Sequence, residues 1–158
     1  MIVVVEEVPA EATYALRHAV LRPHLPLDGV ALAGDDDPET HTFAALDQVS
    51  REVVSTASVR PAHCPEQLIA VLDASSRALP QWRLRGMATK DHLRGLGLGR
   101  EVLDAVLDHV GAKGGGLLWC NARIGAVAFY ERAGLVSVGE PWVEPEIGPH
   151  IVMWRLVG

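Results

Sequence analysis

The chain has 158 residues, of which 49% are hydrophobic and 22% charged, and its formal net charge is −6. This length suits one domain with a sizeable core, and a negative chain without a Lys/Arg run argues against a nucleic-acid partner. No segment approaches the roughly 18 consecutive apolar residues that a membrane span needs, and the opening MIVVVEEVPAEA turns acidic too early for a signal peptide. We therefore expect a cytoplasmic protein, with no nucleic acid and no membrane as partner, that acts on a small molecule.

The first half of the chain predicts a strand, a helix and a hairpin. The β-branched run 2–8 indicates a strand, and residues 10–22 carry apolar side chains at helical spacing that ends before two prolines. After the acidic loop LAGDDDPETH, segments 40–47 and 51–59 indicate two strands joined by a turn. Residues 61–81 show only a short helix near 66–72.

The second half has a sharper pattern. A strand over 81–89 leads into a glycine-rich loop and a helix that ends near Val110. A strand over 116–121, a helix over 123–134 and two closing strands, 135–142 and 150–157, follow. No repeat or low-complexity segment interrupts this order, so we predict a single α/β domain over 1–158.

The two cysteines, Cys64 and Cys120, are far apart in the sequence and have no CxxC spacing. This arrangement favours neither a disulfide framework nor a zinc site, and we expect no metal. Cys120 follows a buried strand and is a conceivable nucleophile, but without a matching His motif core packing is the better interpretation.

The glycine-rich loop places Gly95, Gly97 and Gly99 just before an amphipathic helix. The apolar stripe of that helix comprises Val102, Leu103, Val106, Leu107 and Val110. Its start has no capping side chain, glycines allow close approach of a ligand, and free N–H groups at a helix N-terminus bind anions. The loop therefore predicts a phosphate or pyrophosphate site, with a tight strand-to-helix turn as the alternative.

Three phosphate-binding patterns can be compared with this loop. A P-loop needs Lys-Ser/Thr after its last glycine, whereas Arg-Glu follows here. The dinucleotide fingerprint G-x-G-x-x-G does not fit the spacing G-x-G-x-G, and the next strand ends in Cys-Asn rather than in an acid, which disfavours a nucleotide-dependent oxidoreductase. The pattern Arg/Gln-x-x-Gly-x-Gly is matched by Arg94, Gly97 and Gly99.

That third pattern carries the pyrophosphate of acyl-coenzyme A in the GNAT superfamily of N-acyltransferases, and residues 82–135 resemble the coenzyme-binding half of such an enzyme. RLRGMAT is similar to its splayed fourth strand, RGLGLGREVL to its pyrophosphate loop, and AVAFYERAGL to its second signature, A-x-x-x-Y-x-x-x-G-F, with Leu135 in place of Phe. The resemblance implies one three-layer GNAT-like domain, with a mixed, mostly antiparallel sheet of about seven strands flanked by helices and splayed between the fourth and fifth strands.

The resemblance also implies acetyl-CoA (coenzyme A) as co-substrate. Its pantetheine amides would pair with the backbone of Gly86–Thr89, and Arg94 and Arg100 would add charge near the phosphates. The family often has Asn at position 123, where this chain has Arg123, with Asn121 two residues earlier. The implied coenzyme-binding residues are Met87, Ala88, Thr89, Arg94, Gly95, Leu96, Gly97, Leu98, Gly99, Arg100, Asn121, Arg123, Ala126, Phe129 and Tyr130.

The helix after Asn121 is apolar on two stripes. One comprises Ile124, Val127 and Ala128, and the other Ala126, Phe129, Tyr130 and Ala133. We expect one stripe to pack on the sheet and the other to line the coenzyme arm, with Gly134 ending the helix. Tyr130 then points into the site and is the candidate general acid that protonates the leaving thiolate, with a half-buried structural tyrosine as the alternative.

The attacking amine must be neutral, so a general base should take its proton. The segment EPWVEPEIGPH supplies three candidates, Glu144, Glu146 and His150, and we list Tyr130, Glu144 and His150 as catalytic residues. The predicted function is acetyl-CoA-dependent N-acetylation of a primary amine on a small-molecule or amino-acid-like acceptor. The alternative is a non-catalytic acyl-CoA-binding or regulatory module.

The charge of the acceptor stays open at this point. The acidic loop would suit a cationic amine, whereas Arg17 and Arg22 on the first helix would suit an acceptor with a carboxylate. Edge strands at the C-terminus are compatible with a homodimer.

Overall fold

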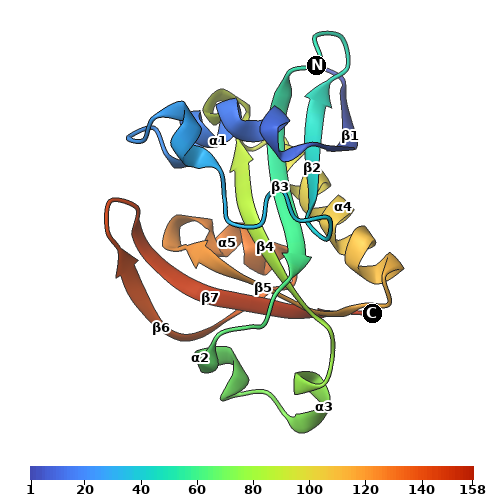
Figure 1. Ribbon diagram of the computed structural model, residues 1–158, viewed down its shortest axis with the longest axis vertical. Coiled ribbons are helices and arrows are strands. Elements are labelled where there is room, and N and C mark those ends of the chain that lie inside the picture. Colours follow the sequence, from blue (N-terminus) through green and yellow to red (C-terminus); the bar gives the residue numbers. More distant parts are fainter. The chain divides into compact units, whose positions relative to one another are not determined.

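The computed structural model describes residues 1–158 and contains seven strands, five α-helices and four 3₁₀ helices (Figure 1). The strands are β1 Val3–Val8, β2 His41–Asp47, β3 Val53–Pro61, β4 Gln81–Thr89, β5 Gly116–Arg123, β6 Val136–Glu144 and β7 Gly148–Val157. The α-helices are α1 Tyr14–Leu21, α2 Glu66–Ile69, α3 Ala74–Arg77, α4 Leu98–Ala112 and α5 Val127–Arg132. The 3₁₀ helices are η1 Ala10–Thr13, η2 Leu27–Val30, η3 Asp91–Leu93 and η4 Ile124–Ala126.

The strands form one sheet in the order β1-β2-β3-β4-β5-β7-β6. Strands β4 and β5 pair in parallel, whereas the pairs β1–β2, β2–β3, β5–β7 and β6–β7 are antiparallel. A mixed, mostly antiparallel sheet of seven strands with helices confirms the predicted α/β fold class.

Contacts within the chain group it into two compact units. Unit 1 comprises Met1–Arg60 and Arg85–His109, and unit 2 comprises Pro61–Leu84 and Val110–Gly158. Strand β4 and helix α4 therefore each contribute residues to both units.

Unit 1 confirms the predicted hairpin and corrects the first helix. Strands β2 and β3 pair from His41↔Val59 to Leu46↔Val53. The helix predicted over 10–22 is split into η1 and the shorter α1, and the buried Thr13 hydroxyl at the junction donates to the Ala10 carbonyl. A side chain that bonds the local backbone competes with α-helical geometry, which the apolar spacing alone does not reveal.

Helix α4 buries the apolar stripe that the sequence predicts. Val102, Leu103 and Val106 are all 0% exposed. Near the end of the helix, the His109 ring lies 4.2 Å from that of His41 and 5.7 Å from that of Phe43, so α4 runs alongside β2 (Figure 1). The α4 packing fixes where the helix begins, and with it the glycine-rich loop.

Unit 2 places the last strand inside the sheet. Strand β7 pairs with β5 from Gly116↔Val157 to Arg123↔His150 and with β6 on its other side. Of the two C-terminal strands, only β6 lies at an edge, so the expectation of two C-terminal edge strands is wrong for β7. Burial explains the order, because Val152 and Met153 at the centre of β7 are 0% exposed.

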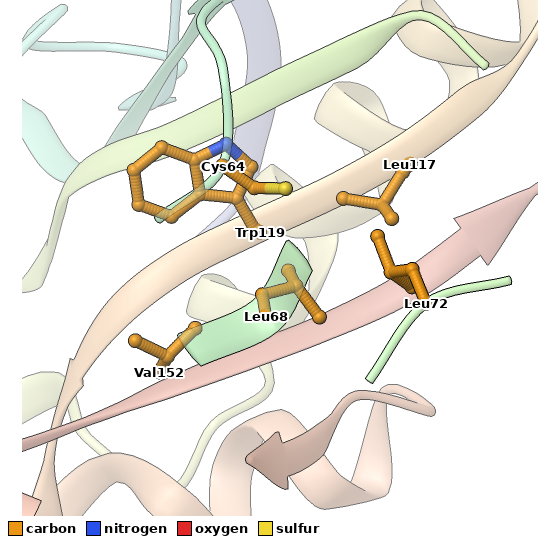
Figure 2. Close-up of a cluster of buried hydrophobic side chains, with 6 residues drawn as sticks. All are labelled: Cys64, Leu68, Leu72, Leu117, Trp119 and Val152. Atoms are coloured by element: carbon orange, nitrogen blue, oxygen red, sulfur yellow. The ribbon is translucent and has the colours of Figure 1, made fainter. Parts of the chain in front are cut away.

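The segment 61–80, which the sequence left unclear, contains two short helices and closes one face of unit 2. Figure 2 shows its contribution, in which Cys64, Leu68 and Leu72 pack with Leu117, Trp119 and Val152. Cys64 is therefore a core residue. The Trp119 indole also donates to the Ala62 carbonyl at 3.0 Å, which ties the segment to β5. No helix of the chain is long and apolar enough to cross a membrane.

Candidate active site

The glycine-rich loop lies in unit 1 between η3 and α4. Gly95 and Gly97 have left-handed backbone conformations, with φ of 81° and 82°, which explains why glycine occupies both positions. A Cβ atom placed on either glycine would meet no other atom within 4 Å. The turn is thus not closed by packing, and open space adjoins the backbone where a ligand could approach.

Helix α4 begins directly after this loop. The Glu101 N–H donates to the Gly97 carbonyl at 3.1 Å, which makes Gly97 the first acceptor of the helix. The N–H groups that precede Glu101 have no partner within the helix. Leu98 is buried and Leu96 is 66% exposed, so one side of the loop is anchored and the other faces solvent. The arrangement has the features of an anion site.

The two arginines of the loop have different surroundings. The Arg94 guanidinium lies 3.0 Å from the Asp91 carboxylate, and both side chains are well exposed. The Arg100 Nε donates to Asp104 at 2.9 Å, one turn along α4. Arg100 therefore forms an ordinary helix-surface pair, which fits the interpretation of a solvated arginine as well as that of a phosphate ligand.

The end of β4 is held by β3 within unit 1. The Ser55 hydroxyl donates to the Ala88 carbonyl at 3.1 Å and shares a hydrogen bond of 2.8 Å with the Thr89 hydroxyl. Ala88 is buried, whereas Met87 and Thr89 are half-buried. These bonds fix the backbone of the segment to which the resemblance assigns the pantetheine arm.

Helix α5 in unit 2 buries one of the two predicted stripes. Tyr130 and Ala133 are 5% and 2% exposed, whereas Ile124 and Ala128 of the other stripe are exposed. The stripe with Ile124 and Ala128, which was expected to pack on the sheet, is therefore not buried, because η4 replaces the first helical turn and changes the phase of the helix. Gly134, with φ of 89°, ends the helix as predicted.

Tyr130 lies in an apolar environment. Burial, together with the nearby Cys120 thiol, raises its pKa well above the ordinary value of 10.0, while Arg123 opposes this effect. The Phe129 ring contacts the Tyr130 ring edge-on at 5.2 Å. The Tyr130 phenol, with its raised pKa, is protonated at neutral pH, as a general acid must be. Burial also raises the pKa of Cys120 to about 12, which supports a packing role for that thiol.

His150 and Glu144 both contact Trp142, which lies beside the candidate glutamate in the sequence but whose contact with His150 the sequence did not indicate. The Trp142 ring stacks on the His150 ring at 5.8 Å, and its indole N–H donates to Glu144 at 2.8 Å. His150 Nδ1 lies 2.9 Å from the Gly148 carbonyl, and since a carbonyl only accepts, Nδ1 is the donor. The Nε2 atom of the neutral ring then carries a lone pair. Glu146 is exposed in the turn before β7.

Charged residues of the first helix and the acidic loop pair with each other. Arg17 bonds Asp35 at 2.7 Å, and Arg60 lies 3.8 Å from Asp37. Arg17 and Asp35, one candidate for an anionic and one for a cationic acceptor, thus neutralise each other, and their pairing was not evident from the sequence. No group of three or more His, Cys, Asp or Glu side chains is arranged to hold a metal ion.

Comparisons with known proteins identify the fold and the family. The "Uncharacterized N-acetyltransferase YitI" of Bacillus subtilis is 31% identical over 152 residues, which cover 96% of this chain and 94% of that protein. The crystal structure of a Lactobacillus plantarum protein matches with a TM-score of 0.72 at 21% identity, over 99% of this chain and 98% of that one. An aminoglycoside 6'-N-acetyltransferase, solved with coenzyme A, matches with a TM-score of 0.66 at 16% identity, over 98% of this chain and 97% of that one.

At these identities the two solved structures show the fold alone. The family described as "Acetyltransferase (GNAT) family" matches residues 10–135, which include η1, α1, the glycine-rich loop and α5. The chain belongs to the GNAT family of acetyltransferases.

Proposed function

We propose that the protein transfers an acetyl group from acetyl-CoA directly to a primary amine of a small-molecule or amino-acid-like acceptor. The observation that carries the proposal is the loop before α4, where two left-handed glycines leave open space beside the first N–H groups of a helix. A pyrophosphate is the part of coenzyme A that such a site suits, because the N–H groups and the helix dipole both favour negative charge. The solved relative with bound coenzyme A supports this choice of donor.

Residues of unit 1 would bind the donor. Backbone N–H groups of Gly95–Gly99 and the exposed Arg94 guanidinium would contact the pyrophosphate. The strand segment Met87–Thr89, held in place by Ser55, would pair with the amides of the pantetheine arm. Acetyl-CoA supplies the thioester whose carbonyl carbon accepts the amine.

Residues of unit 2 would move the protons. His150 Nε2 would take a proton from the amine, and the hydrogen bond from Nδ1 to the Gly148 carbonyl supports this role by fixing the ring tautomer. The Tyr130 hydroxyl would give its proton to the sulfur as the carbon–sulfur bond breaks. Of the two other candidate bases, Glu144 already accepts a hydrogen bond from Trp142, and Glu146 is exposed in the turn before β7.

Asn121 and Arg123 lie at the end of β5 in unit 2 and would contact the donor there. Asn121 is exposed and Arg123 is half-buried, so both can reach a ligand that lies along α5. Ala126 and Phe129, which are also half-buried, would contact the coenzyme arm.

The experiment is a screen of primary amines and amino acids with acetyl-CoA, in which released thiol and the mass of the acetylated product are measured. We expect at least one acceptor to release thiol in proportion to product. If coenzyme A binds by calorimetry but no amine is acetylated, the protein is instead a non-catalytic acyl-CoA-binding module. If coenzyme A does not bind at all, both functions are wrong.

A further inference from the structure

A buried ion pair in unit 1 lies against the strand segment that the proposed function assigns to the coenzyme arm. We infer that Arg17 and Asp35 are positioning residues, which hold the irregular backbone of β4 at Gly86 in the form that receives acetyl-CoA. The inference rests on the proposed function and adds two residues to it that touch neither the donor nor the acceptor.

Three hydrogen bonds to two residues hold the Arg17 guanidinium in place. Its Nη1 donates to Asp35 Oδ2 at 2.7 Å, and its Nη2 donates to Asp35 Oδ1 at 3.2 Å and to the Ser58 hydroxyl at 3.0 Å. Ser58 is itself bonded to Thr42 at 2.7 Å. Arg17 is only 1% exposed, so its position is set by these bonds and not by solvent.

The guanidinium occupies the space in which a side chain of Gly86 would lie. Gly86 has a left-handed conformation with φ of 64°, and a Cβ atom on it would be 3.1 Å from Arg17 Nε. Glycine adopts this conformation without steric cost, so Gly86 can make β4 irregular here, whereas a residue with a side chain would be strained and would also meet Arg17. The Arg17 Nε atom is buried and has no hydrogen-bond partner. Arg17 therefore keeps its place against Gly86 at the expense of one donor, which indicates that Asp35 and Ser58 determine where it lies.

Asp35 is held as firmly as its partner. Besides the two bonds from Arg17, its Oδ2 accepts from the Leu32 N–H at 2.8 Å and from the Tyr14 hydroxyl at 3.1 Å. Burial alone would raise the pKa of Asp35, but the hydrogen bonds from Arg17 and Leu32 outweigh it and hold this pKa below its ordinary value of 3.8. The pair is thus charged at neutral pH, and Arg17 cannot move away from Gly86 without leaving a buried carboxylate unpaired.

A buried ion pair is weak evidence for a role in stability, since a matched apolar pair often serves as well. Removing both charges together can therefore leave the fold stable while it removes the group beside Gly86, and so separates a positioning role from a structural one. The double variant Arg17→Met/Asp35→Leu removes both charges, so neither is left buried and unpaired, and it should retain a cooperative unfolding transition. It also loses the anchored group beside Gly86.

The test measures coenzyme A binding by calorimetry, which needs no knowledge of the acceptor. We expect the dissociation constant to rise by at least about tenfold in Asp35→Asn and in the double variant, the equivalent of roughly one or two lost hydrogen bonds to the arm. Glu6→Gln is the matched control, because Glu6 and Arg51 form a comparable two-bond pair at 2.8 and 2.8 Å on the exposed surface. This control should bind coenzyme A as the unaltered protein does.

Amide hydrogen exchange provides the second measurement. Exchange at Gly86–Thr89 should accelerate in the double variant while exchange in the α4 core stays as slow as before. A stable double variant with unchanged coenzyme affinity overturns the inference and leaves the proposed function intact. Failure of the unaltered protein to bind coenzyme A overturns the proposed function itself.

Discussion

The open space beside Gly97 gives the sharpest test of the pyrophosphate site. In Gly97→Ala the new methyl group meets no protein atom within 4 Å, so it enters the space that we assign to the phosphates. Gly114→Ala is the matched control: Gly114 also has positive φ, 104°, and its added Cβ also meets nothing within 4 Å. Gly114 lies after α4, away from the loop. The two variants therefore introduce a similar strain at different places.

The structure lets the two effects of the change be separated. A residue other than glycine in a left-handed conformation costs about 1–2 kcal/mol, so both variants should lose this much free energy of unfolding. For a chain of this size, that loss lowers Tm by about 2–8 °C. Only Gly97→Ala should also weaken coenzyme A binding, by at least about tenfold or about 1.4 kcal/mol, because a methyl group blocks close approach to the N–H groups.

The assay combines thermal unfolding with calorimetry of coenzyme A at a temperature where both variants are folded. The two single variants differ only in where the methyl group is added, so the same donor, coenzyme A, serves for both. Equal dissociation constants for Gly97→Ala, Gly114→Ala and the unaltered protein, with both variants folded, would refute the pyrophosphate assignment.

Four further predictions follow from the site and its electrostatics. Tyr130→Phe should lower kcat by about 10²–10⁴ while the coenzyme A dissociation constant stays unchanged, and near-normal turnover with rate-limiting chemistry would make the tyrosine structural. His150→Asn keeps a donor for the nearby backbone carbonyl but removes the base, so kcat should fall by about 10²–10⁴; an unchanged kcat would favour Glu144. Because the folded-state pKa of Asp35 is lowered, stability should be lost as pH falls below about 4, and urea unfolding of Asp35→Asn should show a weaker dependence in that range. Cys120, with a pKa of about 12, should react with a thiol reagent at pH 8 only after unfolding, and rapid labelling of the folded protein would contradict its burial.

The local features of this protein follow from the sequence itself. The apolar stripe of α4, the β2–β3 hairpin and the glycine stop after α5 each depend on residues that are close along the chain. The loop can also be predicted from the sequence, because Gly95 and Gly97 have conformations that other residues rarely adopt. Spacing of this kind predicts where a helix begins and why its first N–H groups are free, and the resemblance to the GNAT family rests on the same residues.

Features that depend on distant residues required the tertiary structure. Nothing in the sequence pairs Arg17 with Asp35, which lies 18 residues away, or places their ion pair against Gly86. Strand alternation likewise does not reveal that Trp142 would join His150 to Glu144. A side chain's partner is decided by register, twist and packing, and many partners are compatible with one local pattern. The sequence therefore indicated the kind of site, and the tertiary structure decided which charged side chains pair with one another.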